Sequence, residues 1–85
     1  MNIVFSPQAK KQLHKLPLSL RKTLYKQLTL LEMNPRHPSL RTKRLSGYPY
    51  FEVRITRGYR FVFDRVQDAI WIIALGPHDE GLGKK

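Results

Sequence analysis

The chain has 85 residues, and its 16 Lys and Arg against 6 Asp and Glu give a formal net charge of +10. This length allows one domain, residues 1–85, and a domain of this size buries only about 60% of its unfolded surface, so its stability is marginal. Cysteine is absent, which excludes disulfides, zinc–thiolate sites and thiol nucleophiles. The N-terminus lacks the features of a signal peptide, and the longest strongly apolar run, Ala69 to Leu75, is too short to span a bilayer. We therefore expect a soluble, cytoplasmic domain.

The first half of the chain predicts a short strand followed by a helical hairpin. Residues 3–5 are typical of an edge strand, and Ser6 followed by Pro7 indicates a helix start, because serine caps free amide groups and proline fits the first helical position. We expect this helix to end near Pro17 and a second helix to end at Asn34. The second helix carries one apolar stripe of Leu20, Leu24, Leu28 and Leu31, widened by Leu30.

The second half predicts a sheet. A basic connector over residues 36–46 ends in a strand at Lys43–Leu45, and three runs rich in aromatic and β-branched residues follow at 50–55, 59–66 and 69–75. Short turns between these runs indicate antiparallel hairpins, and the last run is apolar on both faces, as in a covered strand. The predicted fold is α+β, with two N-terminal helices packed on a small twisted antiparallel sheet in the order β-α-α-β-β-β.

The hairpin of the first two of these runs allows a sharper prediction. Apolar residues alternate with polar ones on both strands, and both apolar sets face the core only if opposed residue numbers have an even sum. A three-residue loop over residues 56–58 meets this condition and places Gly58 at the left-handed position that such loops require. Arg54 then lies directly opposite Arg60 on the face away from the core, with Glu52 on the same face and diagonal to Arg60.

Two opposed arginines suggest an anion site. Like charges directly opposed on a sheet destabilise it, and an anion held between Arg54 and Arg60 would relieve the repulsion. The alternative is that both guanidinium groups extend into water, where they interact weakly. His78 follows the last strand, and histidine is the side chain that most readily transfers protons near neutral pH, so it is a candidate for proton transfer, although a single loop histidine is more often without such a role. No metal-ligand spacing is present, and we expect no metal or cofactor.

Positive charge is concentrated around this hairpin. Seven cations and one anion, Glu52, lie between positions 36 and 60. Such a surface attracts polyanions, and we expect nucleic acid, with a membrane surface as the competing interpretation and a surface that only keeps the protein soluble as the third. The candidate RNA-binding residues are Arg36, Arg41, Lys43, Arg44 and Arg57.

Several motifs appear in a characteristic order along nearly the whole chain. They are residues 9–13 (AKKQL) with Leu16-Pro17, Asn34-Pro35, and residues 43–47 (KRLSG), 51–55 (FEVRI), 58–63 (GYRFVF) and 76–80 (GPHDE). In this order the chain resembles the RelE/ParE superfamily, the toxins of bacterial type II toxin–antitoxin systems, and in particular its RelE-like branch.

The resemblance implies an enzyme. RelE-like members are ribosome-dependent mRNA endoribonucleases, or mRNA interferases, which inhibit translation by cutting messenger RNA in the ribosomal A site. Their catalytic groups correspond to Glu52, Arg54, Arg60 and His78 of this chain. We expect metal-independent attack by the ribose 2′-hydroxyl, with the arginines stabilising the charged phosphorane. Glu52 is the candidate base and His78 the candidate acid, or the two roles are exchanged. Alternatively, Glu52 is the group that orients Arg60. The expected partners are a cognate acidic antitoxin, the ribosome and mRNA.

Two other functions remain open. One is a ParE-like inhibitor of DNA gyrase, which would not require Glu52 and His78. The other is a catalytically inactive RNA-binding member. Many RelE-like chains carry a tyrosine a few residues beyond the position of His78, and residues 81–85 here contain none.

Overall fold

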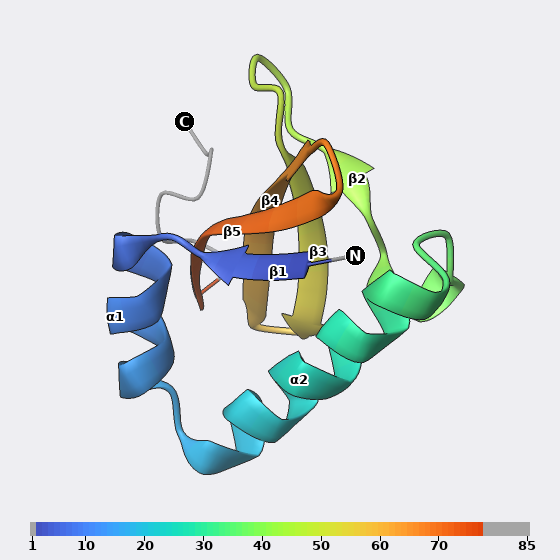
Figure 1. The fold of residues 1–85 in the computed structure, drawn as a ribbon. Helices are drawn as coiled ribbons and strands as arrows, with labels where there is room; N and C mark the ends of the chain where they lie inside the picture. Colours follow the sequence, from blue (N-terminus) through green and yellow to red (C-terminus); the bar gives the residue numbers. More distant parts are fainter. Residues whose placement is uncertain (1, 78–85) are drawn as a thin grey trace.

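The computed structural model of the chain describes residues 2–77 (Figure 1). The elements are β1 (Asn2–Phe5), α1 (Pro7–Lys15), α2 (Leu18–Met33), a short 3-10 helix (Pro38–Leu40), β2 (Lys43–Arg44), β3 (Phe51–Thr56), β4 (Tyr59–Val66) and β5 (Ala69–Pro77). The strands form one sheet in the order β1-β5-β4-β3-β2, and both helices pack against the same face of it. The predicted α+β class, layers and element order are confirmed.

The sheet is mixed and not wholly antiparallel as predicted, because β1 runs parallel to β5 while the other neighbouring pairs are antiparallel. The hairpins predicted from short turns account for the antiparallel part. The direction of β1 is not set by a hairpin, since both helices separate it in sequence from its partner. As predicted, β1 lies at an edge and β5 is covered on both sides by neighbouring strands.

The β3–β4 hairpin has the predicted register but a different loop. The predicted Arg54–Arg60 pair is observed, and in the same register Phe51 pairs with Phe63 and Val53 with Phe61. Nearer the turn, Thr56 pairs with Tyr59, so the loop consists of Arg57 and Gly58 alone, and the predicted three-residue loop is wrong. A β-bulge at Ile55 absorbs the extra residue within the strand. Gly58 consequently does not adopt the left-handed φ that the longer loop would have required.

The main core lies between the helices and the sheet. Leu24, Leu28 and Leu31 of α2 are buried against apolar residues of β3, β4 and β5, which confirms the predicted leucine stripe. Burial of such side chains stabilises the fold by about 1.5–3 kcal/mol each. A second, smaller cluster covers the opposite face, where Val62 and Ala74 pack with Leu45, Tyr50 and Ile73.

The start of α1 is tied to the sheet by one serine. The Ser6 hydroxyl accepts a hydrogen bond from the Ala9 amide at 3.0 Å, as predicted for an N-cap, and donates one to the Ile73 carbonyl at 2.7 Å. Ile73 is the bulged residue of β5, where the register to β4 shifts. The cap therefore also satisfies a backbone group that the bulge removes from the regular ladder.

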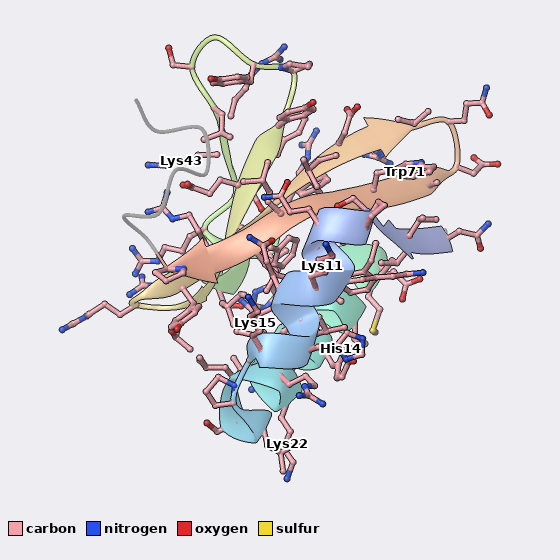
Figure 2. All side chains as sticks on the ribbon, turned by 90° about the vertical axis from the view of Figure 1, so that its left-hand side faces the viewer. Lys11, His14, Lys15, Lys22, Lys43 and Trp71 are labelled. Carbon is pink, nitrogen blue, oxygen red and sulfur yellow. The ribbon has the colours of Figure 1, made fainter. Side chains whose placement is uncertain are left out.

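The helical layer presents a separate basic surface. Figure 2 shows Lys11 and Lys15 along α1 and Lys22 near the start of α2, and all three side chains are exposed. Within residues 2–77, no helix is long and apolar enough to cross a membrane.

Candidate functional site: a cationic pocket beside the β3–β4 hairpin

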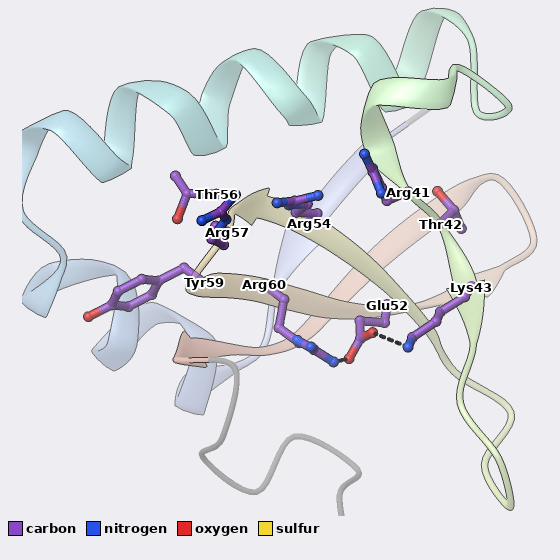
Figure 3. Close-up of a pocket in the computed structure, with 9 residues that line it drawn as sticks. All are labelled: Arg41, Thr42, Lys43, Glu52, Arg54, Thr56, Arg57, Tyr59 and Arg60. Carbon is purple, nitrogen blue, oxygen red and sulfur yellow. Dashed lines mark ion pairs between the residues drawn. The ribbon is translucent and has the colours of Figure 1, made fainter.

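A pocket of about 520 Å³ lies beside the β3–β4 hairpin. It is lined by Arg41, Thr42, Lys43, Glu52, Arg54, Thr56, Arg57, Tyr59 and Arg60 (Figure 3). Five of these side chains are cations and one is a carboxylate, so the lining carries a formal charge of +4. A concave surface with this charge concentrates field lines and attracts anions.

Two of the arginines that line the pocket are placed by the strand register. Arg54 of β3 and Arg60 of β4 are directly opposed, on the sheet face that alternation directs away from the main core. Both side chains are partly buried. The two neighbouring strands thus each supply the pocket with one planar guanidinium group, a donor type that matches the oxygens of a phosphate.

Glu52 is buried between two cations. Its carboxylate forms an ion pair with the Arg60 guanidinium through Oε2, and its Oε1 lies 3.7 Å from Lys43 Nζ. The Glu52 side chain is only 5% exposed, against 66% for Lys43. Figure 3 shows the three side chains as a row across β4, β3 and β2. The row fixes the Arg60 guanidinium, because a buried carboxylate requires charged hydrogen-bonding partners.

A buried glutamine holds two segments of the pocket wall together. Gln27 of α2 donates from Nε2 to the Arg54 carbonyl at 2.8 Å and to the Ser39 carbonyl at 3.2 Å. Ser39 belongs to the 3-10 helix that leads into Arg41, whose backbone is left-handed with φ 50°. Gln27 therefore connects the strand that carries Arg54 to the connector that carries Arg41.

The structure brings together only part of the predicted RNA-binding set. Arg41, Lys43 and Arg57 line the pocket with Arg54, Arg60 and Glu52. Arg36 lies beside a separate hollow that shares Arg41 and Thr42 with the pocket. The Arg44 guanidinium lies over the Phe51 ring, 5.8 Å from its centroid, and does not line the pocket.

Other residues of the site were missed or lie beyond the described part of the chain. Thr42, Thr56 and Tyr59 line the pocket, although only Tyr59 carried a signal, as part of the Gly-Tyr-Arg motif. Tyr59 packs against the core and also lines the pocket. His78 lies outside the described residues.

Comparison with known proteins identifies the class that this fold and this pocket define. The family model described as the ParE toxin of type II toxin–antitoxin system, parDE, matches residues 3–82. The chain therefore belongs to this family of toxins, within the RelE/ParE superfamily. A search of the curated proteins gives no match.

Solved structures of toxins from such systems share the fold. A chain of the intact E. coli RelBE toxin–antitoxin complex is 25% identical with a TM-score of 0.72, covering 88% of this chain and 93% of that one. The YoeB–YefM complex from Staphylococcus aureus contains a chain 23% identical with a TM-score of 0.78, covering 92% and 97%. The archaeal RelE–RelB complex from Pyrococcus horikoshii gives 20% identity and a TM-score of 0.75, covering 93% and 96%.

Proposed function

We propose that this toxin is a ribosome-dependent mRNA endoribonuclease that stops translation by cutting the message in the A site. The observation that carries the proposal is the opposition of Arg54 and Arg60 in a pocket with five cations and one carboxylate. Opposed guanidinium groups repel each other, and a phosphate between them relieves that repulsion while accepting hydrogen bonds from both. The RelE and YoeB folds among the similar structures are further support.

The proposed reaction is a transesterification that needs no metal ion. The ribose 2′-oxygen attacks the adjacent phosphorus, the bond from phosphorus to the 5′-oxygen breaks, and the product carries a 2′,3′-cyclic phosphate. A base takes the proton of the 2′-hydroxyl, and an acid delivers a proton to the departing 5′-oxygen. Arg54 and Arg60 stabilise the additional negative charge that develops on the phosphate oxygens. DNA is not cut, because it lacks the nucleophile.

Within this reaction we assign Glu52 the role of positioning Arg60. Both of its carboxylate oxygens face cations, and its burial keeps it in one place, which favours this role over that of a freely accessible base. Proton transfer then falls to His78 as either acid or base. In the sequence, His78 follows two residues after Gly76 of β5, which pairs with Arg60.

The proposed partners follow from charge. A domain of +10 is complemented by an acidic amphipathic antitoxin segment that covers the helices or the pocket and neutralises both charge and activity. The similar structures that are complexes, RelBE and YoeB–YefM, support such a partner. On the ribosome, in the cytoplasm, we expect backbone phosphates to be held by the outer cations Arg36, Arg41, Lys43, Arg44 and Arg57.

The test is a cell-free translation reaction with a defined mRNA, read by primer extension. We expect the wild type to cut within codons only when ribosomes are present. His78→Ala should slow cutting by about 10²–10⁴-fold, the usual contribution of a general acid or base. Arg60→Lys keeps the ion pair with Glu52 but removes the planar fork, and it should also slow cutting. Lys11→Ala, on the helical surface, is the matched control and should cut like the wild type.

Intact mRNA in the presence of folded toxin and active ribosomes would contradict the proposal. The same protein should then be tested for inhibition of supercoiling by DNA gyrase, the activity of ParE-like members. Inhibition there, unchanged in His78→Ala, would assign the chain to that function instead.

A further inference from the structure

The hairpin between β2 and β3 exposes an aromatic ring that does not line the cationic pocket. Tyr48 stacks on Tyr50 with ring centroids 6.1 Å apart and an angle of 8° between the ring planes. The Tyr48 residue is nevertheless 48% exposed. A hollow of about 530 Å³ lies beside it, lined by the hairpin residues 44–49.

The stack is anchored on the sheet. Tyr50 packs with Leu45 against Val62 and Ala74 on the face away from the helices. The Leu45 amide donates to the Tyr50 carbonyl at 3.0 Å, and the Tyr48 amide donates to the Leu45 carbonyl at 3.2 Å. Gly47 provides the left-handed backbone, with φ 81°, that this tight hairpin requires. The outer ring is thus held in place before any ligand binds, which lowers the entropic cost of stacking on it.

The stack lies in line with the cationic pocket. Tyr50, Glu52 and Arg54 follow each other at every second position, so they share one face of the strand path, and β3 begins between the first two. At about 3.4 Å per residue, Tyr50 is roughly 13–14 Å from Arg54 along this path. Lys43, on the adjoining strand, lies opposite Glu52 between the two sites. Figure 3 shows the hairpin continuing beyond Lys43 on the side of the sheet opposite α2.

We propose that Tyr48 is a stacking platform for an unpaired base of the RNA strand whose phosphate lies between Arg54 and Arg60. This inference rests on the proposed function, because it takes the ligand of the pocket to be RNA. Proteins that hold single strands combine a cationic track for the backbone with exposed aromatic rings for the bases, and both are present here on one face. Stacking accepts any base, so Tyr48 contributes affinity and direction rather than sequence preference.

The experiment measures binding apart from cleavage and without ribosomes. The probe is a short fluorescein-labelled single-stranded RNA with 2′-O-methyl groups throughout, which cannot be cut, titrated at low salt and read by fluorescence anisotropy. A second set of probes carries an abasic residue at each position in turn. Tyr48→Ala should weaken binding of the intact probe by about 5- to 150-fold, the usual effect of removing one stacked ring. Tyr48→Trp should retain binding, and Tyr25→Ala is the matched control, since Tyr25 is 47% exposed on α2.

The abasic probes identify stacking as the cause. One abasic probe should bind the wild type more weakly than the intact probe does. For that probe, Tyr48→Ala should bind no more weakly than the wild type. Equal affinity of Tyr48→Ala and wild type for the intact probe overturns the inference, as does an equal loss for every abasic probe. If Tyr48→Ala leaves RNA binding unchanged and weakens binding of an acidic peptide instead, the inference is also overturned, because the ring then belongs to a protein interface.

The outcome is separable from that of the proposed function. If Arg60→Lys weakens RNA binding and Tyr48→Ala does not, the phosphate site stands and the stacking site is wrong. If Tyr48→Ala weakens binding as expected while the wild type leaves mRNA intact on ribosomes, the stacking site stands and the endoribonuclease is wrong.

Discussion

Arg60 is the residue on which both the stability and the chemistry of the pocket depend. It neutralises a carboxylate that is almost completely buried, and it shares the pocket with an opposed arginine. The strand alternation predicted the opposition of Arg54 and Arg60 and the place of Glu52 beside them. It did not predict the burial of Glu52, because a charged residue at a polar position of a strand is expected to be exposed. That burial depends on cations contributed by both neighbouring strands.

At this scale we expect removal of Arg60 to destabilise the fold through Glu52. Arg60→Met leaves the buried Glu52 carboxylate beside the more distant Lys43. The free energy of unfolding should therefore decrease by about 3–5 kcal/mol, at the lower end of this range because Lys43 remains. Adding Glu52→Gln should restore most of the loss, because an uncharged amide tolerates burial better. Urea denaturation of the two variants and the wild type measures both changes. A double variant no more stable than Arg60→Met would show that the buried charge is not the cause.

At the scale of elements, the pocket is the meeting point of a helix, a connector and a hairpin. The hairpin was largely predictable, because alternation determines which residues face the core. The loop could not be predicted. The rule that opposed residue numbers have an even sum does not say whether the extra residue lies in the loop or in a bulge at Ile55. The Gln27 contacts could not be predicted either, because one polar residue among leucines gives no sign that it hydrogen-bonds a strand 27 residues away.

We expect Gln27 to affect both stability and binding. Gln27→Leu leaves the Arg54 and Ser39 carbonyls without their donor, which should lower the free energy of unfolding by about 1–3 kcal/mol. The same change loosens the connector that carries Arg41, so affinity for single-stranded RNA should also fall. Thermal unfolding and anisotropy titration measure the two effects.

Gln12→Leu is the control for that variant. Gln12 also binds the sheet backbone, accepting from the Leu75 amide at 2.8 Å, but it does not line the pocket. The Gln12→Leu variant should be less stable than the wild type, but its affinity for RNA should fall less than that of Gln27→Leu. Equal losses of RNA affinity in both variants would mean that Gln27 acts only through general stability.

For the whole molecule, the distribution of charge matters more than its total. The pocket carries +4 on one face, and Lys11, Lys15 and Lys22 form a second basic surface on the helices. The sequence predicted the first of these concentrations from the density of cations between positions 36 and 60. It could not predict which of them converge, because Arg36 and Arg44 are near the pocket residues in sequence and yet lie outside the pocket.

Salt dependence should distinguish the two surfaces. If the pocket neutralises four phosphates of a single strand, the binding constant should fall by about 50-fold between roughly 50 and 200 mM salt. Arg41→Ala with Arg57→Ala should lower the slope of log K against log salt by about 1.4. Lys11→Ala with Lys15→Ala should leave that slope unchanged, and an equal reduction by both pairs would contradict recognition by the pocket.

The most direct test of the central claim uses ribosomes programmed with one of two mRNAs. The two differ only at the nucleotide that supplies the attacking group, which carries ribose in one and 2′-deoxyribose in the other. We expect the wild-type toxin to cut the first, leaving a 2′,3′-cyclic phosphate, and to leave the second whole. Cutting of both mRNAs at equal rates, or of neither, would contradict an endoribonuclease that uses the 2′-hydroxyl at this pocket.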